Sequence, residues 1–298
     1  MSVSIKREDL NDPEIQGNKW LKLKPVLILA GEKKINRLVT MGGCFSNHIY
    51  ATAAAGKRFE FETIGIIRGP EPKQYSATLR FAKQAGMQLV FVSRTEFRQL
   101  RTQDTLTNFL QKFQPAYFIP EGGTTSLAVN SCAQYIEPMK HQFDIFCCPV
   151  GTGGTIAGFI KGINNQAQVI GFPVLKGKDF LDQDINHLLE DEQLPHQHQT
   201  WHLNHDYHFG GYAKTNDELD NFIIDFYRQH NILLEPVYTG KMLFGLFDLI
   251  KQRYFKEGSK ILAIHTGGLQ GLEGFPGLKS KLEDLRGKKI SLTEQLTG

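Results

Sequence analysis

The chain has 298 residues, of which 41% are hydrophobic and 22% are charged, and its formal net charge is +3. This length allows one large or two ordinary domains with a sizeable core, and the composition is typical of a globular protein. A charge this small, spread along the chain, does not indicate nucleic-acid binding. No apolar run approaches the roughly 20 residues that a membrane-spanning helix needs, so we expect no membrane insertion.

The N-terminus and the cysteines favour a reducing cytoplasm. The first ten residues are charged and lack the apolar core of a secretion signal. The four cysteines form no CxxC pair and no histidine-supported spacing, so we expect no metal. Cys147 and Cys148 lie in an apolar, strand-like run, where small buried thiols are the expected state.

The first chemically informative stretch is residues 16–23. Lys19 follows Gly17 and Asn18, residue types that begin helices or form turns, and mostly apolar residues come next and can supply a buried helical face. Burial disfavours the ammonium form of a lysine, and a neutral amine can form a Schiff base with a carbonyl cofactor. The commoner alternative is a solvated lysine beside a turn.

From Arg37 onward, short apolar runs alternate with helical segments. This alternation predicts an α/β fold, with parallel sheets and helices on their faces. The predicted strands are residues 38–41, 63–67, 89–92, 117–119, 145–150, 169–172 and 261–265. The predicted helices are residues 46–55, 76–85, 105–113, 127–136, 156–163, 216–230 and 241–254.

Residues 179–208 are polar and contain six histidines, at positions 187, 196, 198, 202, 205 and 208. A metal cluster is conceivable here. The spacings are irregular and no cysteine joins them, which favours a solvated loop or short helices.

The strongest local motif is residues 150–155, with the sequence VGTGGT, between a predicted strand and a predicted helix. Glycines let backbone N–H groups approach an anion, and a helix N-terminus adds partial positive charge. No Gly-Lys-Ser/Thr follows, so the motif is not a P-loop. It predicts a phosphate site, with a tight structural turn as the alternative.

Three further stretches follow the same logic. Residues 42–48 (GGCFSNH) follow a strand and open a helix. Ser46 is an ordinary N-cap, or exposed amides, Ser46 and Asn47 hold a carboxylate or a cofactor oxygen. Residues 235–241 (EPVYTGK) precede a helix, and residues 265–268 (HTGG) end the last predicted strand. Ligands of open parallel sheets bind beyond the carboxyl ends of the strands, so we expect these stretches to meet at one crevice.

Taken in order, these motifs resemble the 1-aminocyclopropane-1-carboxylate deaminase and D-cysteine desulfhydrase family of pyridoxal phosphate (PLP) enzymes. The likeness covers almost the whole chain. It implies the tryptophan synthase beta-like fold, fold type II, with two three-layer α/β/α domains and a homodimer. The larger domain is expected at residues 1–32 and 140–298, with a smaller domain inserted at residues 33–139. The motifs that carry the likeness are KREDL (6–10), GNK (17–19), SNH (46–48), GTGGT (151–155), PVYTGK (236–241) and HTGG (265–268).

The resemblance also implies roles for individual residues. Lys19 holds PLP as a Schiff base and moves the substrate Cα proton, and Ser46, Tyr212 and Tyr238 complete the catalytic set. The cofactor phosphate is bound by Gly151, Thr152, Gly153, Gly154 and Thr155, the ring oxygen by Asn47, and the ring nitrogen faces Thr266. The substrate is bound by Ser46, Asn47, His48, Tyr238 and Thr239.

Some positions depart from the family pattern. Phe45 stands where glutamine is frequent, Tyr50 where arginine is frequent, and Leu21 where arginine is common. The residues after Tyr212 also differ from the usual Gly-x-Pro. These departures bear on the substrate more than on the cofactor.

The implied activity is PLP-dependent elimination or deamination of a small amino acid. Family members that open the cyclopropane ring carry Glu and Leu at the positions of Thr239 and Thr266, whereas desulfhydrases carry Thr at both. The two threonines therefore indicate D-cysteine, converted to pyruvate, ammonia and sulfide. Cyclopropane ring opening is the enzymatic alternative, and a PLP-binding carrier or regulator without turnover is the alternative of another class.

Overall fold

Two parallel sheets organise the structure. The computed structural model describes residues 1–177, 179–190 and 200–297. The strands form a five-stranded sheet in the order β1-β9-β6-β7-β8 and a four-stranded sheet in the order β4-β3-β2-β5. The strands are β1 (Ser2–Arg7), β2 (Arg37–Gly42), β3 (Glu62–Arg68), β4 (Gln88–Val92), β5 (Tyr117–Ile119), β6 (Ile145–Val150), β7 (Gln168–Pro173), β8 (Trp201–Leu203) and β9 (Lys260–His265).

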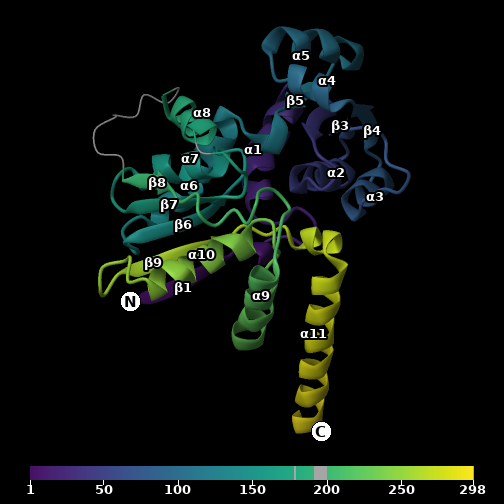
Figure 1. Cartoon of the computed structure of the whole chain (residues 1–298). Coiled ribbons are helices and arrows are strands. Elements are labelled where there is room, and N and C mark those ends of the chain that lie inside the picture. The colour runs from purple at the N-terminus through teal and green to yellow at the C-terminus, as the bar shows by residue number, and fades with distance from the viewer. Residues whose placement is uncertain (178, 191–199, 298) are drawn as a thin grey trace.

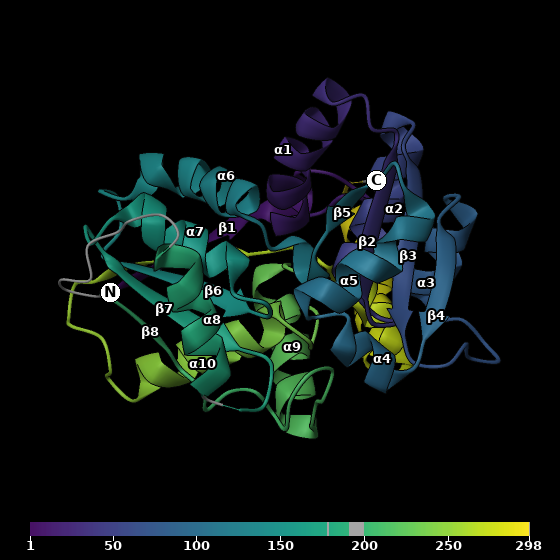
Figure 2. The same cartoon turned by 90° about the horizontal axis from the view of Figure 1, so that it is seen from above.

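Helices cover both sheets, and α1 lies between them (Figures 1 and 2). It packs against α6 beside the five-stranded sheet and against α2 beside the other sheet. In Figure 1, α11 projects away from the rest of the chain. The helices are α1 (Asn18–Glu32), α2 (Asn47–Phe59), α3 (Ala77–Gln84), α4 (Arg94–Gln99), α5 (Gln103–Leu110), α6 (Ser126–Ile136), α7 (Gly154–Ile163), α8 (Asp179–Glu190), α9 (Asp217–His230), α10 (Thr239–Lys251) and α11 (Pro276–Thr297).

Local sequence explains where many of these elements begin. All six residues of β6 are buried, as expected for a central parallel strand with helices on both faces. Ser46, Ser76 and Asn216 are N-caps, and each side chain accepts a hydrogen bond from a backbone N–H in the first turn of its helix.

The predicted α/β fold of type II, with parallel sheets, is confirmed. The prediction did not include β1, α4, β8 or α11. The strand β1 pairs in parallel with β9, near the other end of the chain, and such a partner is not visible in the local pattern. The sheets separate along the chain, since β2 to β5 form one and the remaining strands form the other. The division into domains at residues 32 and 139 stays a prediction.

The histidine-rich segment contains more regular structure than a loop. Helix α8 covers residues 179–190 and β8 pairs with β7, while His196 and His198 lie outside the described residues. Within the part of the chain that is described, no three His, Cys, Asp or Glu side chains are grouped so as to hold a metal ion. None of the helices described there is both long and apolar enough to cross a bilayer.

Candidate active site

A cavity lies where the strands of both sheets end. It encloses about 1090 Å³, including space open to solvent. Each of six strands contributes a lining residue that is its last residue or follows it by one or two positions, so the expected crevice at the carboxyl ends is present. These residues are Gly43 (β2), Arg68 (β3), Glu121 (β5), Gly151 (β6), Leu175 (β7) and Thr266 (β9).

Lys19 lines this cavity from the first turn of α1. Its place depends on Gly17, which has φ +64° and packs so closely that an added Cβ would lie 1.8 Å from the Thr266 carbonyl oxygen. The next residue, Asn18, donates its backbone N–H to that same carbonyl at 3.3 Å. Burial, together with a smaller contribution from the charge of Lys22, lowers the pKa of Lys19 to about 7, so much of this amine is neutral near pH 7.

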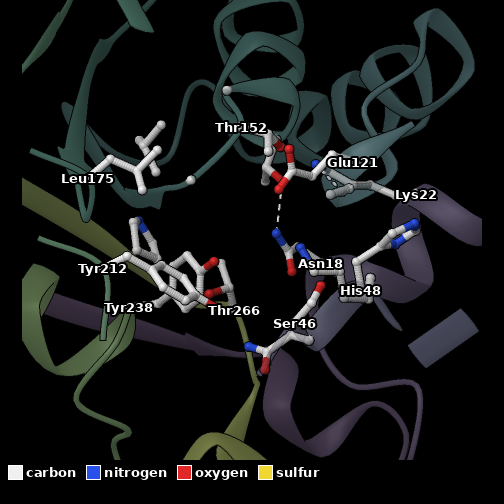
Figure 3. Close-up of a pocket in the computed structure, with 18 of the residues that line it drawn as sticks. Asn18, Lys22, Ser46, His48, Glu121, Thr152, Leu175, Tyr212, Tyr238 and Thr266 are labelled. Atoms are coloured by element: carbon white, nitrogen blue, oxygen red, sulfur yellow. Dashed lines mark hydrogen bonds between the residues drawn. The ribbon is translucent and has the colours of Figure 1, made fainter. Parts of the chain in front are cut away.

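The glycine-rich loop of residues 151–155 lies on the same wall as Lys19. It connects β6 to α7, and Gly153, with φ +81°, precedes the helix without a side-chain cap. The N-cap residue therefore supplies no side-chain acceptor to the first N–H groups of α7, and these groups can bind an anion. Asn18 joins this loop to α1, because its Nδ2 donates to Thr155 Oγ1 at 2.9 Å (Figure 3).

Lys22 is a second lysine at the cavity, and the sequence analysis did not identify it. It is buried, and its Nζ donates to the Gly122 carbonyl at 3.0 Å and to Thr124 Oγ1 at 3.4 Å. Thr124 Oγ1 is in turn 2.8 Å from Thr152 Oγ1 in the glycine-rich loop. Lys22 thus adds positive charge behind the loop, and its spacing of three residues from Lys19 on one helix face was the available signal.

The start of α2 contributes Ser46, Asn47 and His48 to the cavity. His48 is buried, and its Nε2 lies 2.8 Å from Thr40 Oγ1, which donates its own proton to the Ile119 carbonyl. Thr40 therefore accepts from His48, and the ring carries its proton on Nε2. Burial lowers the pKa of His48 well below its usual value, so the ring is neutral. Its buried Nδ1 has no hydrogen-bond partner among the described residues.

Two tyrosines lie together at a third side of the cavity (Figure 3). The rings of Tyr212 and Tyr238 pack edge to face, with centroids 6.0 Å apart. The Tyr212 hydroxyl also donates to the Phe45 carbonyl at 3.4 Å, which connects this side to the loop before α2. Burial raises the pKa of Tyr212 to about 12 and that of Tyr238 well above its usual value, so both hydroxyls keep their protons.

The cavity gathers most of the residues that the sequence analysis selected. Lys19, Ser46, Asn47, His48, Tyr212, Tyr238 and Thr266 all line it, as do Gly151, Thr152, Gly153 and Thr155. Gly154, which was also selected, does not line the cavity and is the first residue of α7. Thr239 does not line the cavity, because it is fully buried and its Oγ1 lies 3.1 Å from Glu235 Oε1. The lining residues that were not selected include Asn18, Lys22, Arg68, Arg101, Glu121 and Leu175.

Comparison with known proteins identifies the class. Residues 1–267 match the family described as "Pyridoxal-phosphate dependent enzyme". The chain belongs to this family, and it is a PLP-dependent enzyme of fold type II.

Individual relatives agree with the resemblance to deaminases and desulfhydrases. A protein of Pyrococcus horikoshii named "Putative 1-aminocyclopropane-1-carboxylate deaminase" is 30% identical over 90% of this chain and 85% of its own. The Arabidopsis thaliana "Bifunctional D-cysteine desulfhydrase/1-aminocyclopropane-1-carboxylate deaminase, mitochondrial" is 29% identical over 90% of this chain and 72% of its own. A crystal structure titled as an ACC deaminase homologue superposes with a TM-score of 0.80 at 27% identity, over 94% of this chain and 88% of that chain.

The cavity suits PLP on its own chemistry. The cofactor has an aldehyde, a phosphate and a heteroaromatic ring, and the cavity offers a matching group for each. Lys19 provides an amine with a lowered pKa, the loop of residues 151–155 provides uncapped N–H groups, and Asn47 and Thr266 provide uncharged polar groups. The residues present therefore fit the cofactor of the family.

Proposed function

We propose that the chain catalyses PLP-dependent α,β-elimination from a small amino acid, with D-cysteine as the preferred substrate. The products are pyruvate, ammonia and sulfide. The observation that carries this proposal is the shared cavity: the Lys19 amine, with a pKa lowered to about 7, lines the same space as the glycine-rich loop and Ser46.

Different residues of the cavity are proposed to bind different parts of the cofactor. Lys19 Nζ would be the attachment point, the loop of residues 151–155 would bind the phosphate, Asn47 would bind the ring oxygen, and Thr266 would lie by the ring nitrogen. Bound PLP supplies an aldehyde carbon that bonds an amino group, and a conjugated ring that acidifies the Cα–H of the attached amino acid.

Lys19 is also the proposed base. A neutral amine can accept the substrate Cα proton, and the lowered pKa provides that neutral form near pH 7. Ser46 lines the same cavity at the N-terminus of α2, where its hydroxyl and the helix amides can hold the substrate carboxylate. His48 contributes a neutral ring whose Nδ1 lone pair is free to accept a hydrogen bond.

The two tyrosines are suited to the leaving group. Their raised pKa values keep both phenols protonated, so each can donate a hydrogen bond to sulfur as the Cβ–S bond breaks. Thr266 offers a hydroxyl and no charge to the ring nitrogen, which weakens the electron sink relative to a carboxylate partner. Loss of a good β-leaving group then suits this site better than transamination.

Ring opening of 1-aminocyclopropane-1-carboxylate is the second candidate, because relatives of this chain carry that name. The two threonines favour D-cysteine, although they act differently. Thr266 lines the cavity, whereas Thr239 reaches it only through the turn that it shares with Glu235. Thiolate also leaves more readily than an unactivated ring opens.

One assay under one set of conditions separates the candidates. It compares D-cysteine, L-cysteine, D-serine, β-chloro-D-alanine and 1-aminocyclopropane-1-carboxylate, and measures pyruvate, 2-oxobutanoate and sulfide. We expect D-cysteine to give the highest kcat/KM. Turnover of the cyclopropane without turnover of D-cysteine contradicts the substrate proposal, and binding without any turnover supports the carrier alternative.

The attachment point has its own test. Borohydride reduction of the cofactor-loaded protein should fix the cofactor to the peptide that contains Lys19. Lys19→Ala should prevent the labelling, whereas Lys24→Ala, an exposed lysine on the same helix, should leave it unchanged. A label on any other lysine contradicts the role of Lys19.

A further inference from the structure

The two cavity tyrosines lie in segments with irregular backbone conformations. Tyr212 lies in an irregular loop between β8 and α9, in which Phe209, Gly210, Gly211 and Ala213 all have positive φ. Tyr238 is the residue before α10, with φ −122° and ψ −71°, outside the regular regions. Backbone conformations of this kind persist only where the surrounding structure holds them. The edge-to-face arrangement of the two rings therefore needs external support.

A buried lysine supports the loop that carries Tyr212. Lys241, in the first turn of α10, is fully buried, and its Nζ donates to the His208 carbonyl at 2.8 Å and to the Gly211 carbonyl at 2.7 Å. Gly211 directly precedes Tyr212. These charge-assisted bonds tie both ends of the irregular turn to α10.

A buried glutamate supports the turn that carries Tyr238. Glu235 is fully buried, and its Oε1 accepts from the backbone N–H groups of Tyr238 at 2.8 Å and Thr239 at 2.6 Å. Its Oε2 accepts from the Val237 N–H at 2.7 Å. One carboxylate thus satisfies three successive amides and fixes the backbone at Tyr238.

Neither charged residue lines the cavity. A buried charge is costly unless it is paired and hydrogen-bonded, and here each charge is satisfied by backbone groups next to a cavity tyrosine. Burial lowers the pKa of Lys241 to about 8 and the charge of Glu235 opposes this shift, so the two charged groups interact electrostatically. If the two residues only stabilised the fold, their hydrogen bonds would not need to lie next to both cavity tyrosines.

We propose that Glu235 and Lys241 are positioning residues, which hold Tyr238 and Tyr212 in one arrangement facing the substrate. The inference rests on the proposed function for the role of the tyrosines. Two residues outside the cavity, Glu235 and Lys241, then determine how the tyrosines are oriented toward the leaving group. Any effect of Lys241 on the reaction must then pass through Tyr212.

A double-mutant cycle on the cofactor-loaded enzyme tests this route. Lys241→Met keeps the length of the side chain and removes the donors, and Tyr212→Phe removes the hydroxyl that the lysine is proposed to position. We expect Lys241→Met to lower kcat about tenfold in the native background and no more than about twofold in the Tyr212→Phe background. Lys251→Met, an exposed lysine at the end of the same helix, is the matched control and should leave kcat unchanged.

Hydrogen exchange supplies a readout that needs no substrate. The Gly210, Gly211 and Lys214 amides donate within the loop, to His208 Nδ1, the His208 carbonyl and the Gly211 carbonyl. In Lys241→Met we expect these amides to exchange at least about tenfold faster, while amides of β6 keep their native rates. If the panel of amino acids shows no turnover, the proposed function fails, and loop exchange still decides the role of Lys241.

Two results overturn the proposal. One is an equal loss of kcat in the native and Tyr212→Phe backgrounds, because the lysine then acts independently of the tyrosine. The other is unchanged loop exchange in Lys241→Met. If that variant does not fold, Lys241→Gln, which keeps one donor group, replaces it in the same cycle and the same exchange experiment.

Discussion

On one side of the cavity, the backbone of Gly17 packs against the Thr266 carbonyl, and the Asn18 side chain joins residues 17–19 to Thr155 in the loop of residues 151–155. We call this the cofactor side. The other side presents side chains, among them Ser46, His48 and the exposed Arg68, and the exposed Phe45 directly precedes Ser46 in the chain. We call this the substrate side. Both sides lie at the carboxyl ends of strands, yet they are built by different means.

The comparison shows at which positions a substitution can be accommodated without moving the backbone. At Gly17 an added Cβ would lie 1.8 Å from a carbonyl oxygen, so a substitution there moves backbone. Phe45 is 52% exposed, so its side chain can change without moving the chain. This explains why Phe45 departs from the family pattern while the motifs around Lys19 and residues 151–155 keep it. Under the proposed function, the cofactor side determines the chemistry and the substrate side adjusts the choice of amino acid.

The largest expected effect is at Gly17 on the cofactor side. Gly17→Ala forces a Cβ into the Thr266 carbonyl at positive φ, and we expect it to lower the free energy of unfolding by about 2–5 kcal/mol and to prevent cofactor binding. Gly31→Ala, on the same helix with no heavy atom within 4 Å of its added Cβ, is the control and should stabilise by about 0.5–1 kcal/mol. Thermal unfolding and cofactor absorbance measure both. A native-like Gly17→Ala protein contradicts this account.

The second prediction concerns pH. Lys19 has a pKa lowered to about 7, so the amine is protonated below that pH and neutral above it. Capture of free cofactor by the stripped protein should therefore slow about tenfold for each pH unit below 7 and level off above it. Stopped-flow absorbance measures this rate. A rate that keeps rising to pH 10 indicates a lysine with an ordinary pKa.

Ser46 tests the boundary between structure and substrate binding. Its side chain caps α2, so Ser46→Ala should cost about 1 kcal/mol of stability. If Ser46 also holds the substrate carboxylate, KM should rise about tenfold. Ser93 does not line the cavity, so Ser93→Ala, which removes the equivalent cap from α4, should cost similar stability with no change in KM. Equal KM values in the two variants leave Ser46 as a cap only.

The smallest effect is expected at Phe45 on the substrate side. Phe45→Gln keeps the backbone carbonyl that accepts from Tyr212, so cofactor affinity should not change. The ratio of kcat/KM between D-cysteine and a bulkier amino acid should shift by up to about tenfold. Ile28→Gln, 53% exposed on α1, is the control. Loss of cofactor from Phe45→Gln would show that the two sides are not independent.

The central part of the fold could be predicted from the sequence because its signals are local. Strands such as β6 are short apolar runs, and residues 154–163 follow a glycine-rich turn that begins a helix. Ordered motifs along the chain also pointed to the family and its cofactor. The strand β1 could not be found in this way, since its partner β9 is more than 250 residues away in the sequence.

The residues of the candidate site also differ in whether the sequence alone could identify them. The residue types at Lys19, Ser46 and residues 151–155 were sufficient to select them, because each lies where a strand or turn meets a helix. The roles of Thr40, Lys22, Glu235 and Lys241 could not be read from the sequence. Their partners are carbonyls and hydroxyls of distant segments, and nothing local identifies those groups.

The sequence by itself determined the fold class, the family and the set of chemical groups available to the reaction. These depend on periodicity, on glycine-rich turns and on motif order, which are properties of the linear chain. The tertiary structure decided the protonation of those groups and their directions. Lys19 has a lowered pKa because it is buried beside Lys22, and Tyr212 faces Tyr238 where Lys241 ties its loop to α10. Burial and hydrogen-bond direction depend on which distant segments meet, and only folding brings those segments together.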